Sequence, residues 1–368
     1  MARNRPFRHF LVALVGVFAL AVLGSLVTFR AQFGMMTWKT AARCLGAEAK
    51  MQAIAALPSP KLVFIGGSAV HMGINTEMLG AALGMPAGNF GTLAALGPKI
   101  MLFNALQVLK RGDTAVVVFE YGLYWRNRPT EAEIDFAMGC GETYVRSLSL
   151  IEQLQFALGA DPLRFLFVRN IPRDEELRRQ KQRLTSNGDA RFTLFNFSPQ
   201  DEAQIERMRR YRPANTSFDR GSRDARAIAE FVELAHANGI NVLAAWPNTL
   251  RFAEYDSDPG LRAIAGFYRE LGVPMVGTPQ DAMLAFEYLH DTQFHLNKAG
   301  IIQRTTTLIG NLRPLVGEDL RDMRSTPDIQ AGDKVPISLM NGSGASRYHE
   351  PEPGKASDRA VQNPTHLE

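Results

Sequence analysis

The sequence predicts an α/β fold, a three-layer, doubly wound parallel sheet with helices on both faces. Short apolar runs alternate with longer stretches of helical periodicity over residues 60–313, which is the pattern of strand–helix–strand units. The runs are apolar throughout, as expected of strands that are buried on both faces. With 46% hydrophobic and 21% charged residues, the 368-residue chain is globular, and a wholly disordered, collagen-like or coiled-coil protein is excluded.

The first 30 residues predict a cytoplasmic tip and a membrane anchor. Arg3, Arg5 and Arg8 precede twenty uncharged residues, 10–29, which as a helix cover the ~30 Å hydrocarbon thickness of a bilayer. The arginines favour a single-pass protein of the cell inner membrane with its N-terminus inside and its main domain in the periplasm. A cleaved signal peptide is the alternative, although this run is longer than usual and lacks a clear cleavage site.

Residues 31–59, rich in Ala and Met, predict a helical stalk that lifts the following domain off the bilayer. The α/β domain occupies residues 60–313, and the right-handed crossover rule favours a flavodoxin-like strand order. Its strands are predicted at 62–65, 85–90, 115–119, 240–245 and 273–276, and its helices at 76–84, 97–110, 223–237, 261–271 and 297–311.

A mostly helical insertion is predicted over about residues 125–221, between the third and fourth strands, where it could roof a site. Aromatic residues open it (Tyr121, Tyr124 and Trp125), and arginines are frequent later. Residues 169–212 hold eleven Lys/Arg and seven Asp/Glu, which favours a solvated surface over a contact with an anionic lipid or polymer. Residues 314–368 are polar and irregular and predict a disordered tail.

The composition also bears on cofactors and partners. A net charge of +4 is too small to indicate a nucleic-acid partner. Cys44 and Cys140 lack zinc-type spacing and form at most one disulfide. No phosphate-binding glycine motif and no metal-ligand cluster occurs in the sequence, so no cofactor is expected.

Three segments carry side chains suited to catalysis and are predicted to meet at the carboxyl edge of the sheet, where open α/β folds bind ligands. Ser68 follows Gly66 and Gly67 after the first strand, so a sharp turn can expose its hydroxyl. Asn89 and Gly91 end the second strand. Each feature alone is as well explained by an ordinary turn or a loop cap.

The third segment supplies a base. Asp291 and His295 lie on one loop before the last helix, which Asn297 can cap, and could act as orienter and base for a serine. A lone histidine would more often be structural. His71 and His290 are weaker candidates, because His71 can simply line the loop and His290 would point away from Asp291 in an extended segment.

Together these blocks resemble the SGNH (GDSL-type) hydrolase superfamily over residues 60–125 and 222–312. The resemblance implies that Ser68 is the nucleophile, His295 the general base and Asp291 its partner. The residues proposed for oxyanion or substrate contacts follow the strands and are Gly67, Asn89, Gly91, Ala94, Tyr121 and Asn248. Glu120, an acid at the end of the third strand, could be a substrate ligand or a salt-bridge partner.

This chain departs from the family pattern in four places. Gly67 stands where the family has Asp, and Ala94 stands where the second block has Gly. Asp291 precedes the histidine by four residues where the family spacing is three. The third-block asparagine is missing after the third strand, which reads Phe-Glu-Tyr-Gly over 119–122, so Asn248 or a tyrosine would have to replace it.

The membrane anchor is similar to the branch of the superfamily that includes alginate O-acetylation proteins and the D-alanyl transfer protein of teichoic acid synthesis. The resemblance implies O-acyl (acetyl) transfer to, or hydrolysis from, a cell-surface or exported polysaccharide, with a membrane-bound acyltransferase as acyl donor. The alternative is an inactive polysaccharide-binding or assembly protein of an exopolysaccharide export complex, in which aromatic residues of 121–125 stack on sugars.

Overall fold

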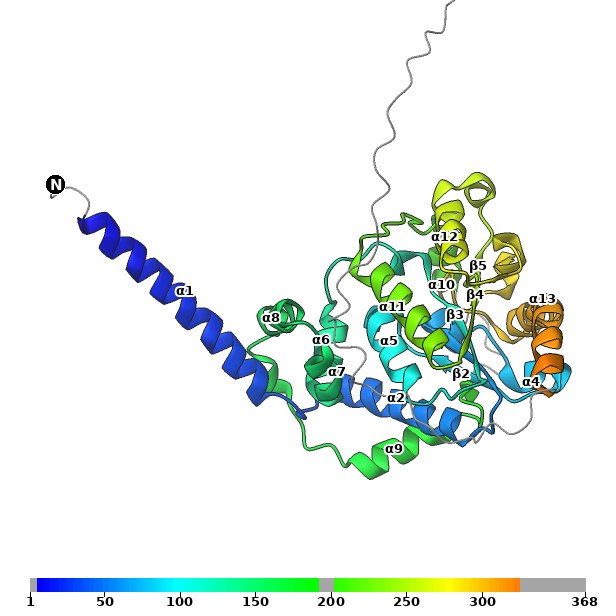
Figure 1. Cartoon of the computed structure of the whole chain (residues 1–368), viewed down its shortest axis with the longest axis horizontal. Helices are drawn as coiled ribbons and strands as arrows, with labels where there is room; N and C mark the ends of the chain where they lie inside the picture. The colour runs from blue at the N-terminus through cyan, green and yellow to red at the C-terminus, as the bar shows by residue number, and fades with distance from the viewer. Residues whose placement is uncertain (1–4, 192–201, 325–368) are drawn as a thin grey trace, which may run out of the picture.

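The computed structural model describes residues 5–191 and 202–324. A domain built on a parallel sheet carries one long helix, α1 (Arg5–Ala31), which projects from it (Figure 1). α1 is long and apolar enough to span a membrane, and its apolar window is unburied in the structure. Residues 325–368, which belong to the predicted disordered tail, lie outside the described part of the chain.

The predicted α/β class and five parallel strands are confirmed. The central sheet has the strand order β2-β1-β3-β4-β6, with every neighbouring pair parallel. A second sheet, which the sequence did not predict, pairs β5 (Thr249–Leu250) with β7 (Met283–Leu284). The central strands are β1 (Leu62–Gly66), β2 (Ala87–Gly91), β3 (Thr114–Val118), β4 (Asn241–Ala245) and β6 (Met275–Val276).

Alternate side chains of each strand enter two different cores, because successive residues of a strand point to opposite faces. Val63 and Ile65 of β1 face the larger core, and Leu62 and Phe64 face the smaller. The larger core is covered by α2 (Trp38–Ala56), α5 (Gly97–Leu106), α11 (Arg223–Ala237) and α12 (Pro259–Glu270), and the smaller by α4 (Thr76–Leu83) and α13 (Lys298–Arg324).

The predicted insertion is helical and lies mainly beside α1 and α2. α8 contacts α1, and α9 runs along α2. The insertion helices are α6 (Glu131–Cys140), α7 (Glu142–Ser147), α8 (Leu150–Gly159), α9 (Arg173–Gln182) and α10 (Glu202–Arg209).

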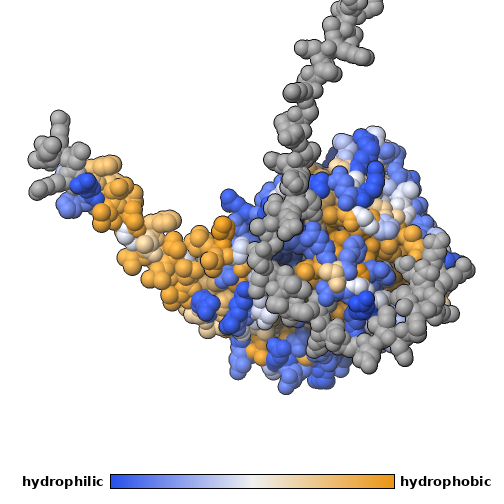
Figure 2. All heavy atoms as spheres, in the orientation of Figure 1, coloured by the Kyte–Doolittle hydropathy of each residue, from blue (hydrophilic) through white to orange (hydrophobic). Residues whose placement is uncertain are grey.

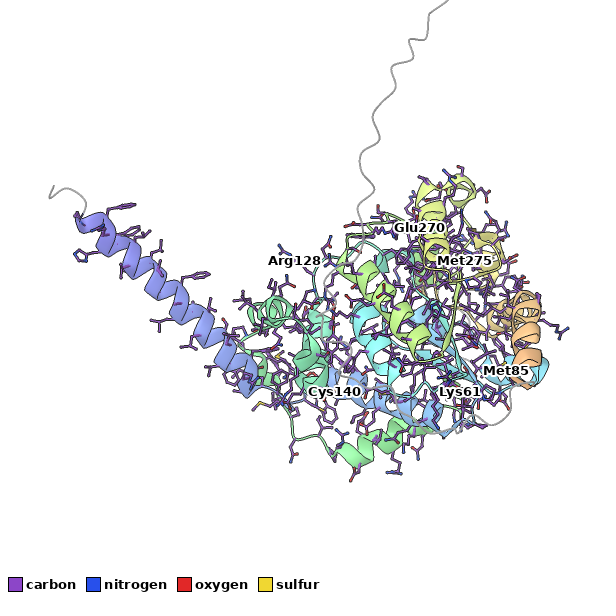
Figure 3. The ribbon with its side chains drawn as sticks, viewed as in Figure 1. Lys61, Met85, Arg128, Cys140, Glu270 and Met275 are labelled. Atoms are coloured by element: carbon purple, nitrogen blue, oxygen red, sulfur yellow. A yellow bond between two sulfur atoms is a disulfide. The ribbon has the colours of Figure 1, made fainter. Side chains whose placement is uncertain are left out.

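The prediction that residues 31–59 form a stalk that lifts the domain off the bilayer is wrong, although most of the segment is helical, as α2. α2 packs on the domain, against β2 and α6, and its buried face includes Ala41, Leu45 and Ile54. Small alanines allow the helix to lie close to its neighbours, and the same alanines gave the sequence its stalk-like composition. A disulfide between Cys44 and Cys140 joins α2 to α6, on the side of the domain next to α1 (Figure 3).

The last helix is longer than predicted. The sequence suggested an end at residue 311, but α13 continues through Pro314 to Arg324. A proline inside a helix costs about 3 kcal/mol. Leu308, Leu312 and Val316 are nevertheless buried in the smaller core, so apolar packing spaced for a helix continues across the proline.

Candidate active site

Ser68 is the first residue of a four-residue helix, α3 (Ser68–His71), directly after β1. The two preceding glycines allow close approaches that a side chain would block. A Cβ on Gly66 would overlap the Val118 carbonyl, and one on Gly67 would overlap the Glu120 carboxylate and lie 2.8 Å from the Ala94 Cα. Ser68 is therefore placed at the carboxyl edge of the sheet, half-buried and next to the end of β3.

Glu120 lies two residues after the end of β3, in the segment where the third-block asparagine is missing. Its Oε1 accepts hydrogen bonds from the Ala69 N–H at 2.8 Å and from the Ser68 hydroxyl at 3.4 Å. Its Oε2 is buried and has no hydrogen-bond partner among the described residues. Burial raises the pKa of Glu120, and the Ala69 N–H, the charge of His295 and the Ser68 hydroxyl oppose this rise only in part. Burial therefore favours the neutral form of Glu120 more than it is favoured in an exposed glutamate.

Asp291 and His295 form a pair despite their four-residue spacing. The Nδ1 of His295 lies 2.7 Å from Oδ1 of Asp291. This hydrogen bond lowers the pKa of the Asp291 carboxyl, with burial opposing it. The carboxylate thus accepts the Nδ1 proton and leaves Nε2 as the nitrogen able to take a proton. The Nε2 of His290 lies 4.0 Å from Asp291, so it does not point fully away as predicted.

The loop with His295 is docked on the helix that begins with Ser68. The Leu296 N–H donates to the Met72 carbonyl at 3.2 Å. The Asn248 amide donates to the Phe294 carbonyl, and a Cβ on Gly73 would overlap the Asn248 side chain. Asn248 therefore holds the His295 loop against the turn after α3, and its amide is engaged by a backbone carbonyl.

The pKa of His71, next to the serine helix, is lowered well below its ordinary value. Burial is the main cause of the lowered pKa of His71. Within the described part of the chain, the Ser68 hydroxyl bonds Glu120 and does not bond His295. Catalytic hydrogen bonds are often long or absent without substrate.

Asn89 and Gly91 support α3 from below. The Asn89 amide donates to the Val70 carbonyl and to Asp189, both at 3.0 Å, and its oxygen accepts from the Gly91 N–H at 2.9 Å. A Cβ on Gly91 would overlap the backbone of His71. Asn89 is fully buried, and both of its N–H groups are used inside the protein. In this structure its amide positions the serine helix and does not face the crevice.

Tyr121 and Tyr124 are not available for stacking on sugars, which corrects the expectation from the sequence. Both are buried. The Tyr121 ring packs edge-on against Tyr255, and the Tyr124 hydroxyl lies 3.0 Å from that of Tyr268. Burial raises the pKa of Tyr121 and of Tyr124 well above the usual value. Trp125 remains 41% exposed.

A buried polar network beneath α3 was missed by the sequence analysis. Lys50 of α2 donates to the Asn89 carbonyl and to its side-chain oxygen, both at 3.1 Å, and to the Gly188 carbonyl at 2.9 Å. Burial lowers the pKa of Lys50 to about 7, with the charge of Asp189 opposing. The signal in the sequence that could have indicated this network is Lys50 itself, a lysine among the alanines of the segment predicted as a stalk.

Among the residues that the structure describes, no group of His, Cys, Asp and Glu side chains could hold a metal ion. Comparison with models of protein families and with curated proteins finds no match to this chain. The assignment of a function therefore depends on the geometry of the site itself.

Proposed function

We propose that the protein is a membrane-anchored, SGNH-like serine enzyme that transfers or hydrolyses O-acyl groups on a cell-envelope polysaccharide. The observation that carries the proposal is the joining of two distant segments. The backbone bond from Leu296 to Met72 brings the Asp291–His295 pair, with a bond of 2.7 Å, to the same sheet edge as Ser68. A nucleophile, a base and an oriented acid are the parts that acyl transfer requires.

In the proposed reaction, the Ser68 oxygen attacks the acyl carbonyl while Nε2 of His295 takes the hydroxyl proton. For this step the Ser68 hydroxyl must exchange its hydrogen bond to Glu120 for one to His295. The C–O bond to the donor alcohol breaks, and His295 returns the proton to that leaving oxygen. A sugar hydroxyl or water then attacks the acyl-serine, with His295 again as base, and Ser68 is regenerated.

Glu120 in its neutral form completes the oxyanion site in this proposal. The Ala69 N–H is already used by Oε1, so that backbone donor is not free. A protonated carboxyl offers a replacement, because its Oε2–H would be a buried donor with no other partner among the described residues. A carboxylic acid kept neutral in a buried site can donate such a bond.

Two features support an extracytoplasmic location and a membrane anchor. The Cys44–Cys140 disulfide is typical of proteins that fold in an oxidising compartment. α1 is preceded by arginines, which favour the cytoplasmic side. The acyl acceptor is proposed as an emerging polysaccharide and the donor as a membrane-bound acyltransferase, with the exposed Trp125 as a candidate for stacking on a sugar.

A fluorophosphonate probe tests the proposal on the full-length protein. We expect the probe to label the wild type and the Ser217→Ala control, which removes an exposed serine away from the site. Labelling should be lost in Ser68→Ala and slowed in His295→Ala. Intact, folded protein that is never labelled and releases no acetate from an aryl ester would exclude the enzyme.

The second candidate is a polysaccharide-binding or assembly protein with the same fold and no catalysis. It is favoured by the bond from Ser68 to Glu120, which leaves the serine without a hydrogen bond to His295 in the described structure. Polysaccharide binding that survives unchanged in Ser68→Ala, combined with no labelling of the wild type, would support this candidate.

A further inference from the structure

The part of the domain next to α1 exposes apolar side chains in an unusual concentration. On α8, Leu150, Ile151, Leu154 and Leu158 face outward, and Ile151 is 72% exposed. Phe156, on another side of the same helix, is buried in the core. A surface helix of a water-soluble domain normally turns polar residues outward, whereas α8 has an apolar side that none of the described residues covers.

The exposed apolar surface continues into the loop after α8. Leu163, Phe165, Leu166 and Phe167 point outward, and Phe167 is 60% exposed. We call the exposed apolar side chains of residues 150–167 the anchor-proximal patch. Contiguous exposed apolar surface of this kind marks a site that something else covers.

Arg164, in the middle of this loop, holds the patch in place. It is buried, and its Nε donates to Asp135 at 2.7 Å. Its guanidinium also donates to the Thr40 hydroxyl at 3.0 Å and to the Met35 carbonyl at 2.8 Å. The apolar neighbours of Arg164 are therefore presented outward by a fixed internal ion pair, so they are not an unpacked piece of core.

The patch lies at the base of α1. α8 contacts α1 directly, and the Arg169 N–H donates to the Met36 carbonyl at 2.9 Å. Residues 35–40, which follow α1, are thus hydrogen-bonded to the loop that carries the patch. Figure 2 shows the hydrophobic colour of α1 continuing onto the adjoining part of the domain, where α8 lies in Figure 1.

We propose that the anchor-proximal patch is embedded in the outer interface of the lipid bilayer, with α8 lying in the membrane plane. The inference rests on α1 being the membrane anchor of the proposed function. Amphipathic interfacial segments bury their apolar side about 5–10 Å deep, at the boundary of headgroups and acyl chains. Trp38, Lys39 and Arg169 are exposed nearby and suit the headgroup layer, where aromatic and cationic side chains are favoured.

Lipid is favoured over a protein partner because the patch is continuous with a helix that must itself end at the bilayer surface. Attachment at two points, through α1 and through α8, would also fix the orientation of the domain on the membrane. A domain joined only through α1 would rotate about it.

Single-cysteine labelling tests this in liposomes that contain only the purified full-length protein and phosphatidylcholine. The two native cysteines are joined in a disulfide, so an introduced cysteine is the free thiol of each variant. An environment-sensitive fluorophore is attached at Ile151→Cys or Leu166→Cys. The matched control is Gln303→Cys, an exposed residue of α13, which Figure 1 shows on the far side of the domain from α1. Val17→Cys reports on α1.

We expect the labels at 151 and 166 to emit at shorter wavelength and to lose most of their intensity to acyl-chain nitroxide lipids, while the label at 303 keeps its intensity. If the label at 17 is quenched and those at 151 and 166 behave like 303, the lipid contact is refuted and the anchor stands. If the label at 17 is also unquenched, the anchor fails and the inference with it. If the emission of the labels at 151 and 166 shifts to shorter wavelength only after a second membrane protein is added to the liposomes, lipid is equally refuted as the occupant.

Discussion

At the scale of single residues, the protonation state of Glu120 is the main variable of the site. Its carboxyl is buried beside Ser68, accepts bonds from Ala69 and Ser68, and forms no ion pair among the described residues. A negative charge there would oppose the negative charge that develops on a substrate oxyanion. A neutral carboxyl would instead stabilise it.

Glu120→Gln tests this directly, because the amide keeps one acceptor oxygen and adds a permanent donor at the second position. We expect the wild type to lose activity as pH rises through the raised pKa of Glu120, and the variant to retain activity without this decline. Glu120→Ala, which removes the donor, should lower kcat by about 10²–10³. A pH–rate profile of aryl ester hydrolysis measures all three. Equal loss in the Gln and Ala variants would show that the charged form is required.

The same carboxyl should make stability pH-dependent. The unfolded chain ionises Glu120 above its ordinary pKa of 4.5, whereas the folded protein keeps it neutral to higher pH. The free energy of unfolding should therefore fall as pH rises from about 4.5 through the folded-state pKa. Urea unfolding of the wild type and of Glu120→Gln at several pH values measures this contribution, and parallel curves would contradict the prediction.

The catalytic candidates were predictable at this scale, but their partners were not. Ser68, Asp291 and His295 follow strands or precede a helix, so the position of each at the sheet edge follows from the strand pattern. The hydrogen bond between Glu120 and Ala69 depends on the close approach of the chain segments that follow β1 and β3. Gly66 and Gly67 permit this approach, but their presence in the sequence does not predict it. The prediction that Tyr121 and Tyr124 stack on sugars was wrong because their burial depends on rings distant in the sequence, such as Tyr255.

At the scale of elements, α2 is the helix whose role differs most from the prediction. The alanines and methionines of residues 31–59 suggested an isolated stalk, yet alanines of α2 belong to a face that packs on β2 and α6. Helical periodicity predicted the helix itself. Its docking depends on surfaces contributed by the insertion, whose helices follow almost a hundred residues later, and a local pattern cannot contain that information.

The Cys44–Cys140 disulfide should contribute strongly to the attachment of α2. It joins residues 96 positions apart. A cross-link that closes a loop of this length lowers the entropy of the unfolded chain and is expected to raise the free energy of unfolding by about 4–5 kcal/mol, although measured values are more often about 2–4 kcal/mol. We expect Cys44→Ser/Cys140→Ser to lower the free energy of unfolding by about 2–4 kcal/mol. Urea unfolding of this variant against the wild type, each with and without reductant, measures the loss. A reductant effect of similar size in the variant would contradict the assignment.

At the scale of the whole molecule, the sequence predicted the sheet because its strands are buried on both faces and therefore read as continuous apolar runs. The strand order β2-β1-β3-β4-β6 also agrees with the flavodoxin-like order that the crossover rule favours. The place of the insertion was less predictable. It was expected to be able to cover the site. α8 and α9 lie beside α1 and α2, whereas Gln204 of α10 and Tyr211 donate to the carbonyls of His290 and Asp291, next to the candidate base.

The hydrogen bond between Leu296 and Met72 has a consequence for how the protein is made. The chain is synthesised from its N-terminus, and Ser68 emerges more than two hundred residues before His295. The bond that docks the histidine loop can form only after nearly the whole domain has been synthesised. Under the proposed function, a nascent chain that has not yet released residues 291–297 would carry Ser68 without its proposed base, and it would stay inert toward acyl esters until then.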